Sequence, residues 1–198
     1  MNDYLPTHPR ALRELSAIEA RRALLDREQM RPLQALAREL RAEDRGKVPN
    51  FDPLDGGMQA SVLFLMEKPG PMTDGSATTR RKGSGFISRD NDDPAAEAVF
   101  RFMETAGIDR RLTLIWNIVP WWNGTRTTKP EELVAGRDRL VRLLDLLANF
   151  RAVVAVGGRA ERARGLIEAR TLPFLSSPHP SPINRAARPD LWWAIPAR

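Results

Sequence analysis

Short apolar runs bounded by turn residues recur along the chain and are separated by longer stretches that favour helix. Four of these runs are predicted to be buried strands: residues 60–66, 111–119, 152–156 and 171–176. Three stretches between them are predicted to be helices: residues 94–105, 130–148 and 160–169. Strands that alternate with helices form parallel sheets covered on both faces. The pattern therefore predicts an α/β fold, a three-layer αβα arrangement around a four-stranded parallel sheet.

Residues 9–45 predict two further helices ahead of the sheet. Pro32 suits the start of the second helix, and apolar residues follow it at helical spacing. We expect a single domain over residues 1–198, with a helical N-terminal extension over 1–50 and the α/β core over 60–195. The extension either packs on the core or, because it is rich in arginine, contacts DNA.

Composition narrows the classes of protein to consider. The chain has no cysteine, which removes disulfides and iron–sulfur clusters, and no apolar run of the roughly 20 residues that cross a membrane. Its N-terminus lacks the apolar core of a signal peptide. We expect a soluble, cytoplasmic protein and a monomer. The formal charge of +6 is compatible with a polyanionic partner such as DNA, although charge alone does not identify one.

Polar residues follow three of the predicted strands, at the ends where open parallel sheets bind ligands. Glu67 and Lys68 follow the first strand, Asn117 lies near the end of the second, and His179 follows the fourth. The loop 67–93 is rich in glycine and proline, and so long a loop in a compact domain is usually functional. We expect these loops to converge on one crevice.

The loop that carries His179 is stiffened by three prolines in five residues, at positions 178, 180 and 182. Such a segment cannot be helix interior or central strand. By itself it is either a rigid connector with an exposed histidine or a ligand-binding loop. A short closing helix is expected within residues 184–195.

Four short motifs occur in order along the predicted core. They are Met66-Glu67-Lys68-Pro69-Gly70, Gly85-Phe86, Ile115-Trp116-Asn117 and His179-Pro180-Ser181-Pro182-Ile183. Together they resemble the uracil-DNA glycosylase superfamily. The first resembles the Gly-Glu-Ala-Pro-Gly motif of its iron–sulfur branch, and the last is similar to the family's His-Pro-Ser-Pro-Leu motif. The resemblance covers roughly residues 60–195 and implies a glycosylase that acts on DNA.

The resemblance implies roles for the residues around an extruded base. Phe86 would stack on the base, Asn117 would pair with O4 and N3–H of uracil, and Met66 would belong to the same base site. His179 would donate a hydrogen bond to the anionic O2 of the leaving base. Two alternatives stay open: Phe86 as ordinary core, and Asn117 as a partner of backbone groups at the strand end.

The last motif also implies contacts with the DNA strand. Ser181 would grip a phosphate, Ile183 would wedge into the vacated stack, and Asn184 and Arg185 would contact the DNA backbone. Ser181 is otherwise a simple turn residue.

The first motif departs from the family's most familiar branch. Lys68 stands where that branch has a water-orienting aspartate, and a protonated lysine cannot act as a base. Glu67 is the candidate for positioning water and stabilising the sugar cation, Asp74 is the alternative, and a mechanism without a base is the third option. Gly70 replaces a tyrosine that blocks thymine, so thymine exclusion must come from elsewhere or be weaker.

The sequence therefore predicts a monofunctional DNA repair glycosylase. It would flip uracil out of uracil-containing DNA and hydrolyse the N-glycosidic bond, with His179 and Glu67 as catalytic residues and with no metal or other cofactor. One alternative is a glycosylase that prefers another deaminated base, hypoxanthine. The other is a DNA- or uracil-binding module without catalysis, which Lys68 favours.

Overall fold

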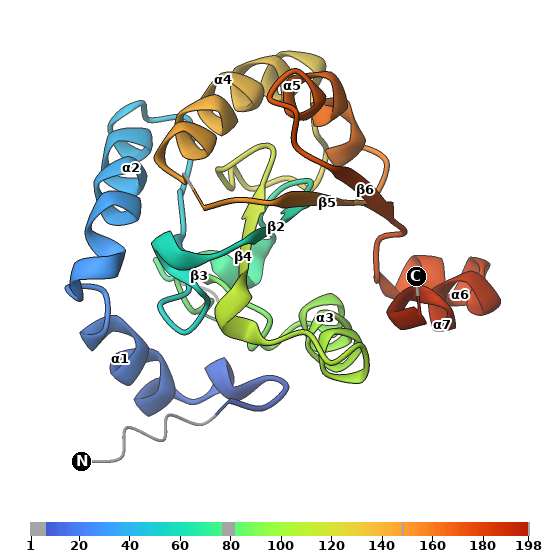
Figure 1. The fold of residues 1–198 in the computed structure, drawn as a ribbon. Coiled ribbons are helices and arrows are strands. Elements are labelled where there is room, and N and C mark those ends of the chain that lie inside the picture. The colour runs from blue at the N-terminus through green and yellow to red at the C-terminus, as the bar shows by residue number, and fades with distance from the viewer. Residues whose placement is uncertain (1–6, 77–81, 148, 198) are drawn as a thin grey trace.

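The computed structural model describes residues 7–76, 82–147 and 149–197, in which helices surround a parallel sheet (Figure 1). In these residues the sheet has four strands: β2 (Val62–Met66), β4 (Thr113–Asn117), β5 (Ala152–Val156) and β6 (Phe174–Ser177). Their spatial order is β4-β2-β5-β6, and each neighbouring pair is parallel. The predicted αβα fold with a four-stranded parallel sheet is confirmed.

Helices cover both faces of the sheet. The α-helices of the described residues are α1 (Leu15–Ala23), α2 (Arg31–Ala42), α3 (Pro94–Thr105), α4 (Pro130–Leu146), α5 (Arg164–Glu168), α6 (Pro182–Ala187) and α7 (Pro189–Trp193). The 3-10 helices are η1 (Ala11–Arg13), η2 (Glu28–Met30), η3 (Gly57–Gln59), η4 (Pro71–Thr73), η5 (Arg110–Leu112), η6 (Ala160–Ala163) and η7 (Ile195–Ala197). Figure 1 shows α4 and α5 on one side of the sheet and α3 on the other. Within the described ranges, no helix combines the length and the apolar character needed to cross a membrane.

Two predicted helices are divided in the structure. The stretch 160–169 is a 3-10 turn followed by α5, and the expected closing helix is split into α6 and α7. The second break falls at Arg188, whose backbone leaves the helical region with φ −145°. Pro189 follows it, and a proline disfavours helical backbone in the residue before it.

Two short strands that the sequence did not predict tie the N-terminal part to the end of the long loop. They are β1 (Asn50–Phe51) and β3 (Phe86–Ile87), which pair in parallel. The ring of Phe51 stacks on Trp116 of β4, with ring centroids 3.8 Å apart. Two-residue strands have no readable periodicity, so the sequence placed both in loops. The ladder holds the end of the 67–93 loop beside the sheet.

The N-terminal helices pack on the α/β core. Helix α2 buries its leucines in the same apolar core as the sheet, and Arg139 of α4 pairs with Glu43 just after α2 at 2.7 Å. The segment around α1 forms a smaller core with β3: Leu12, Ala17, Ile18 and Phe86. The extension therefore packs on the core, as the first of its two interpretations predicts.

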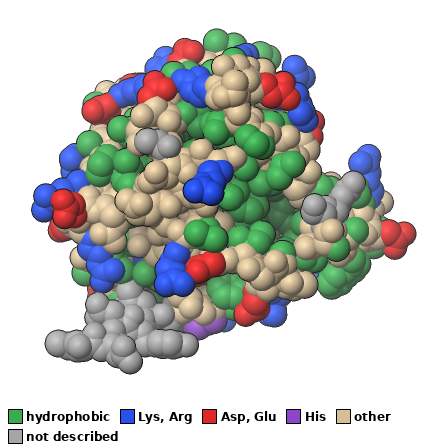
Figure 2. All heavy atoms as spheres, in the orientation of Figure 1, with side chains coloured by type: hydrophobic (Ala, Val, Ile, Leu, Met, Phe, Trp, Pro, Cys, Tyr) green, Lys and Arg blue, Asp and Glu red, His purple; other side chains and the backbone are tan. Residues whose placement is uncertain are grey.

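Charged and apolar side chains separate on the face seen in Figure 2. Hydrophobic side chains gather in the hollow between the body of the molecule and the C-terminal segment, whereas Lys, Arg, Asp and Glu lie mostly around the edge, with a few near the centre of the face. The positive charges of this face are thus interleaved with negative ones rather than gathered in one patch.

Candidate active site

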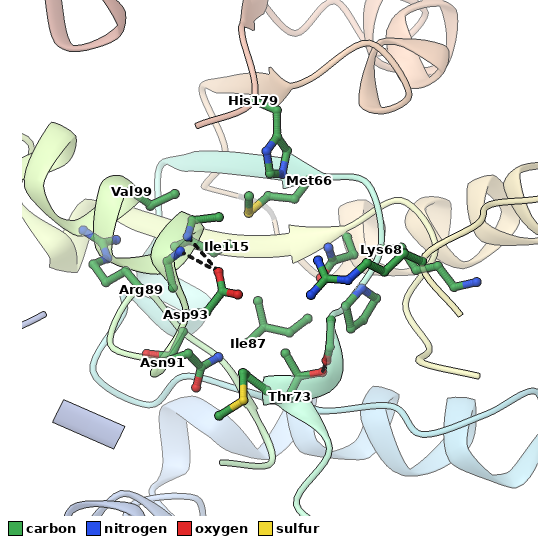
Figure 3. Close-up of a pocket in the computed structure, with 18 residues that line it drawn as sticks. Met66, Lys68, Thr73, Ile87, Arg89, Asn91, Asp93, Val99, Ile115 and His179 are labelled. Atoms are coloured by element: carbon green, nitrogen blue, oxygen red, sulfur yellow. Dashed lines mark hydrogen bonds between the residues drawn. The ribbon is translucent and has the colours of Figure 1, made fainter. Parts of the chain in front are cut away.

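A cavity of about 150 Å³ lies at the carboxyl ends of β2 and β4 (Figure 3). The segment after β2 contributes Lys68 and Gly70, β4 contributes Asn117, and the proline-rich loop contributes His179. Further parts of the wall come from β3, the loop after it, the start of α3 and the loop after β4. Loops far apart in sequence meet at one site, as predicted. In the part of the chain that the structure describes, no three His, Asp or Glu side chains gather as a metal site would require.

Asn117 is the last residue of β4 and lies level with Met66 at the end of β2. Asn117 is only 4% exposed, and none of the described residues donates a hydrogen bond to its Oδ1. Burying an unpaired amide oxygen costs about 1–3 kcal/mol, so such an atom needs an explanation. Asn117 and Met66 both line the cavity, as expected for base-binding residues. A ligand with an N–H donor could therefore supply the missing hydrogen bond.

His179 enters the same cavity from a loop whose backbone is fixed on two sides. Asn184 Nδ2 donates to the carbonyl oxygen of His179 at 2.8 Å. Gly157, with φ +90°, approaches so closely that a Cβ placed on it would lie 3.1 Å from the Cβ of His179. Burial lowers the pKa of His179 below its ordinary value, although Glu67 and Asp93 act in the opposite direction. The imidazole is therefore neutral at pH 7 and carries one N–H donor.

Phe86 does not line the cavity, which corrects the prediction that its ring stacks on a base. The ring is fully buried in the small core beside α1. Neighbouring residues of a strand point to opposite faces, and Ile87 is the one that lines the cavity. The alternative of ordinary core packing is therefore the correct one for Phe86, and the cavity wall at β3 is aliphatic.

Glu67 also lies elsewhere, which corrects its assignment as the residue that positions water. Its Oε1 accepts a hydrogen bond from the Thr128 hydroxyl at 2.6 Å and pairs with Arg159 Nε at 3.0 Å. It lines a separate groove that also touches His179. Asp74, the alternative, accepts hydrogen bonds within its own turn. Neither carboxylate lines the cavity.

Lys68 lines the cavity but its charge is neutralised. Its ammonium donates to Glu132 Oε1 at 2.9 Å and to the carbonyl of Thr127 at 3.0 Å, and the side chain is 3% exposed. Burial raises the pKa of Glu132, but the backbone amide of Lys129 and the Lys68 ammonium outweigh it, so the net pKa is lowered. Glu132 therefore stays ionised. Lys68, the residue that favoured an inactive protein, is therefore paired with a buried carboxylate.

Asp93 and Arg126 are among the charged residues of the cavity that were not predicted as site residues. Oδ1 of Asp93 caps α3 by accepting from the amides of Ala95 at 2.8 Å and Ala96 at 3.1 Å. Its other oxygen points into the cavity (Figure 3). The Asp-Pro pair marks Asp93 as a helix cap in the sequence, but a cap uses one oxygen and the pattern says nothing of the other. For Arg126 the only signal was a basic residue in a loop that follows Asn117.

The residues predicted to contact DNA lie at the start of α6. Ser181 Oγ caps this helix by accepting from the amide of Asn184 at 3.2 Å, which is the turn role. Ile183 is 78% exposed, as a wedge residue needs to be. The guanidinium of Arg185 lies over two tryptophan rings, 5.1 and 5.3 Å from their centroids. Their contact with DNA stays a prediction.

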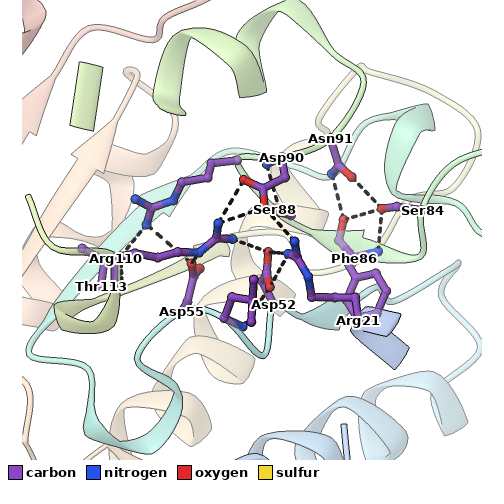
Figure 4. A network of polar contacts seen from close by, with 12 residues as sticks. Arg21, Asp52, Asp55, Ser84, Phe86, Ser88, Asp90, Asn91, Arg110 and Thr113 are labelled. Carbon is purple, nitrogen blue, oxygen red and sulfur yellow. Dashed lines mark hydrogen bonds and ion pairs between the residues drawn. The ribbon is translucent and has the colours of Figure 1, made fainter. Parts of the chain in front are cut away.

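A buried ionic network adjoins the cavity wall (Figure 4). Its members are three arginines and three aspartates: Arg21, Arg89, Arg110, Asp52, Asp55 and Asp90. Arg21 of α1 binds Asp52 at 2.6 and 2.7 Å and Asp90 at 2.8 Å. Arg110 binds all three aspartates at distances from 2.6 to 3.0 Å. Arg89 belongs to both regions, because it also lines the cavity.

A family of known proteins matches most of the chain. A sequence model of the Uracil DNA glycosylase superfamily matches residues 54–195. The matched region contains the four strands of the main sheet and every residue described here as lining the cavity. No curated protein sequence matches the chain.

Proposed function

Because the chain belongs to the uracil-DNA glycosylase superfamily, we propose that it is a monofunctional DNA glycosylase that removes uracil from DNA. The enzyme extrudes the uracil nucleotide, hydrolyses its N-glycosidic bond and leaves an abasic site. The family match supports a hydrolytic glycosylase with DNA as its partner. The observation that carries the choice of uracil is the buried, unpartnered Oδ1 of Asn117 in the cavity.

The Watson–Crick edge of uracil suits the Asn117 amide. Uracil offers an N3–H donor next to the O4 acceptor, so Oδ1 accepts and Nδ2 donates. Cytosine presents an acceptor at N3 and a donor at N4, which is the opposite pattern. Sites that recognise a base through buried polar groups can reject a mismatched ligand by about 10⁴–10⁵-fold, because its groups are left unpaired. This pairing would protect cytosine, the normal base closest to uracil.

His179 supports departure of the base. The bond from N1 to C1′ breaks with its electron pair going to the base, so negative charge develops on O2. A neutral imidazole, which the lowered pKa of His179 favours, can donate its N–H to this oxygen. Removing a comparable donor costs about 2.7–4 kcal/mol in the barrier. His179 is therefore the leaving-group residue of the proposal.

A strand-cleaving lyase step needs a free amine that attacks the sugar. Lys68 is the one lysine among the described residues that line the cavity, and its ammonium is paired with Glu132. The same pairing supports an active enzyme over an inactive binding module. We therefore expect base release without strand cleavage.

The test uses duplexes that carry one uracil, hypoxanthine, thymine or cytosine at the same position, followed by alkali, which cleaves at abasic sites. We expect alkali-dependent cleavage at uracil, none at cytosine, and none without alkali. Asn117→Ala should abolish selective release, whereas Asn149→Ala, which removes an exposed asparagine, should not. Binding of uracil-containing DNA without release of any base would support the binding module instead.

Hypoxanthine is the second candidate, and one feature of the cavity favours it. Its N1–H and O6 repeat the donor and acceptor pattern of uracil on a larger ring. The cavity wall at Gly70 is open, since a Cβ placed there would meet no atom within 4 Å. Release of hypoxanthine but not uracil from the same set of duplexes would show that hypoxanthine, and not uracil, is the substrate.

A further inference from the structure

Asp93 has the only carboxylate among the described residues that line the cavity. The positive side chains around it are mostly engaged, since Lys68 pairs with Glu132 at 2.9 Å and Arg89 with Asp55 at 3.5 Å. Oδ1 of Asp93 is occupied by two backbone amides. In the described part of the chain, no hydrogen bond or ion pair reaches Oδ2, which points into the cavity (Figure 3).

We propose that Asp93, rather than Glu67, is the carboxylate that acts on the sugar: Oδ2 stabilises the developing cation and accepts a proton from the attacking water. This inference rests on the proposed glycosylase function. Asp93 is then a catalytic residue that lies outside the first motif, at the other end of the 67–93 loop.

The backbone holds this carboxylate in place before any substrate arrives. Two amide hydrogen bonds, of 2.8 and 3.1 Å, fix Oδ1 at the N-terminus of α3, a helix of 12 residues. The positive end of the helix macrodipole faces the carboxylate and favours its negative charge. A group that is fixed in advance loses little freedom when the reaction needs it.

Two further observations place a ligand beside Asp93. The first is Asn117, whose buried and unpartnered oxygen belongs to the same cavity and is suited to a base. The second is His179, whose pKa is influenced by the charge of Asp93 and which lines the same space. A base held between Asn117 and His179 would therefore bring its sugar into the region that contains Oδ2.

The step balances with water as the only co-reactant. The C1′–N1 bond breaks, and its electron pair goes to the base, whose O2 accepts a hydrogen bond from His179. The water oxygen forms the new bond to C1′, and its proton passes to Oδ2 of Asp93 and then to solvent. The carboxylate is thus regenerated and no metal, oxidant or covalent intermediate takes part.

Two substitutions separate this role from helix capping. Asparagine and serine cap helices about as well as aspartate, so Asp93→Asn and Asp93→Ser keep the cap and remove the carboxylate. Both should lower kcat for base release by at least about 100-fold, the usual contribution of a general base, with KM changed by only a few-fold. The melting temperature should stay near that of the unaltered protein. Asp109→Asn is the matched control, because Asp109 caps η5 by accepting from the amide of Arg111 at 2.9 Å in an exposed position.

A pH profile adds a readout that a purely structural role would not move. Asp93→Asn should change the dependence of the rate on pH, because the variant has no carboxylate at this position. The charged or titratable groups that share the cavity are Lys68, Arg89, Arg126 and His179, and all remain in the variant. Glu67→Gln, assayed in parallel, should retain a rate within about 10-fold of the unaltered protein, a smaller loss than the general-base effect.

The outcomes distinguish this inference from the proposed function. If the unaltered protein releases no base from any duplex, the proposed function fails. If it releases a base and both Asp93 variants keep rates within about 10-fold, only this inference is overturned. A raised KM with unchanged kcat would also overturn it and make Asp93 a base-reading residue.

Discussion

The molecule contains two neighbouring buried polar regions that differ in how their groups are satisfied. In the ionic network, three arginines and three aspartates balance in charge, and its hydrogen bonds from Arg21 and Arg110 are 2.6 to 3.0 Å long. In the cavity, Asn117 keeps a buried oxygen without a partner, and Asp93 uses only one oxygen. The groups of the network mostly bind one another, whereas the cavity keeps polar atoms that no protein group binds.

The difference separates structural polar groups from those that await a ligand. Buried polar atoms are normally paired because leaving one unpaired costs about 1–3 kcal/mol. The network meets this rule except at Asp55 Oδ2 and Arg89 Nε, and Arg89 is the residue that also lines the cavity. The boundary between the two regions therefore passes through Arg89. Substitutions on either side should change stability in one region and activity in the other.

The largest expected effect is on the network side. Arg21→Ala should lower the free energy of unfolding by about 3–5 kcal/mol, because Asp52 and Asp90 would stay buried with fewer positive partners. Urea unfolding measures this change. Arg22→Ala is the control, since the exposed neighbour should change stability by no more than about 0.5 kcal/mol. Equal losses in the two variants would contradict a structural network.

A pH-dependent effect comes next, at Asp55. Burial raises its pKa from 3.8 to about 6, although Arg110 and Arg89 act in the opposite direction. The folded protein therefore holds this proton more tightly than the unfolded chain. The resulting stabilisation is complete below about pH 4 and is lost as the pH rises through about 6.

Asp55→Asn cannot titrate and should not show this loss. The unfolding free energy of the unaltered protein minus that of the variant should fall by roughly 1–3 kcal/mol between about pH 4 and pH 7. Urea unfolding at several pH values gives the difference. A constant difference across that window would show that the carboxyl does not titrate in this way.

A smaller effect is expected where the backbone supports His179. Gly157→Ala forces a side chain into φ +90° and sets its Cβ 3.1 Å from the Cβ of His179. We expect a loss of about 1–3 kcal/mol in stability and a slower release of base, because the histidine is displaced. Gly158→Ala is the matched control, since a Cβ there meets no atom within 4 Å. Similar behaviour of the two variants in both assays would remove Gly157 from the support of the site.

The smallest change in stability is expected at Asn117. Asn117→Ala removes an unpaired buried oxygen, so the free energy of unfolding should stay within about 1 kcal/mol or increase. Thermal or urea unfolding of the variant, beside the loss of base release, tests this contrast with Arg21. A large destabilisation would mean that the amide has a structural partner in solution.

The sequence predicted the sheet and three residues that line the cavity, Met66, Asn117 and His179, because their signals are local. Each strand is an apolar run with turn residues beside it, and Asn117 and His179 lie at or after strand ends. The side of a strand on which a residue lies is less readable, because a shift of one position exchanges the two faces. For this reason the sequence analysis placed Phe86 at the base site, although Ile87 is the residue that lines the cavity.

Long-range pairing accounts for the other differences. Glu67 forms a hydrogen bond with Thr128 and an ion pair with Arg159, and no spacing in the sequence predicts these partners. The network likewise joins residues 21, 52, 90 and 110 across four separate segments. Asp93 was recognised as a cap from its local sequence, but the direction of its second oxygen depends on how α3 lies against the sheet.

The network also bears on how this protein could be recombined with its relatives. The family match starts at residue 54, yet Arg21 and Asp52, which bind Asp90 and Arg110, come before that point. A fragment cut at this boundary would also uncover the ring of Phe86, which the α1 segment shields from water. The matched region on its own would therefore lack Arg21 and Asp52 as partners for Asp90 and Arg110, and would expose the ring of Phe86. A chimera should therefore keep the N-terminal helices and the matched region from the same protein.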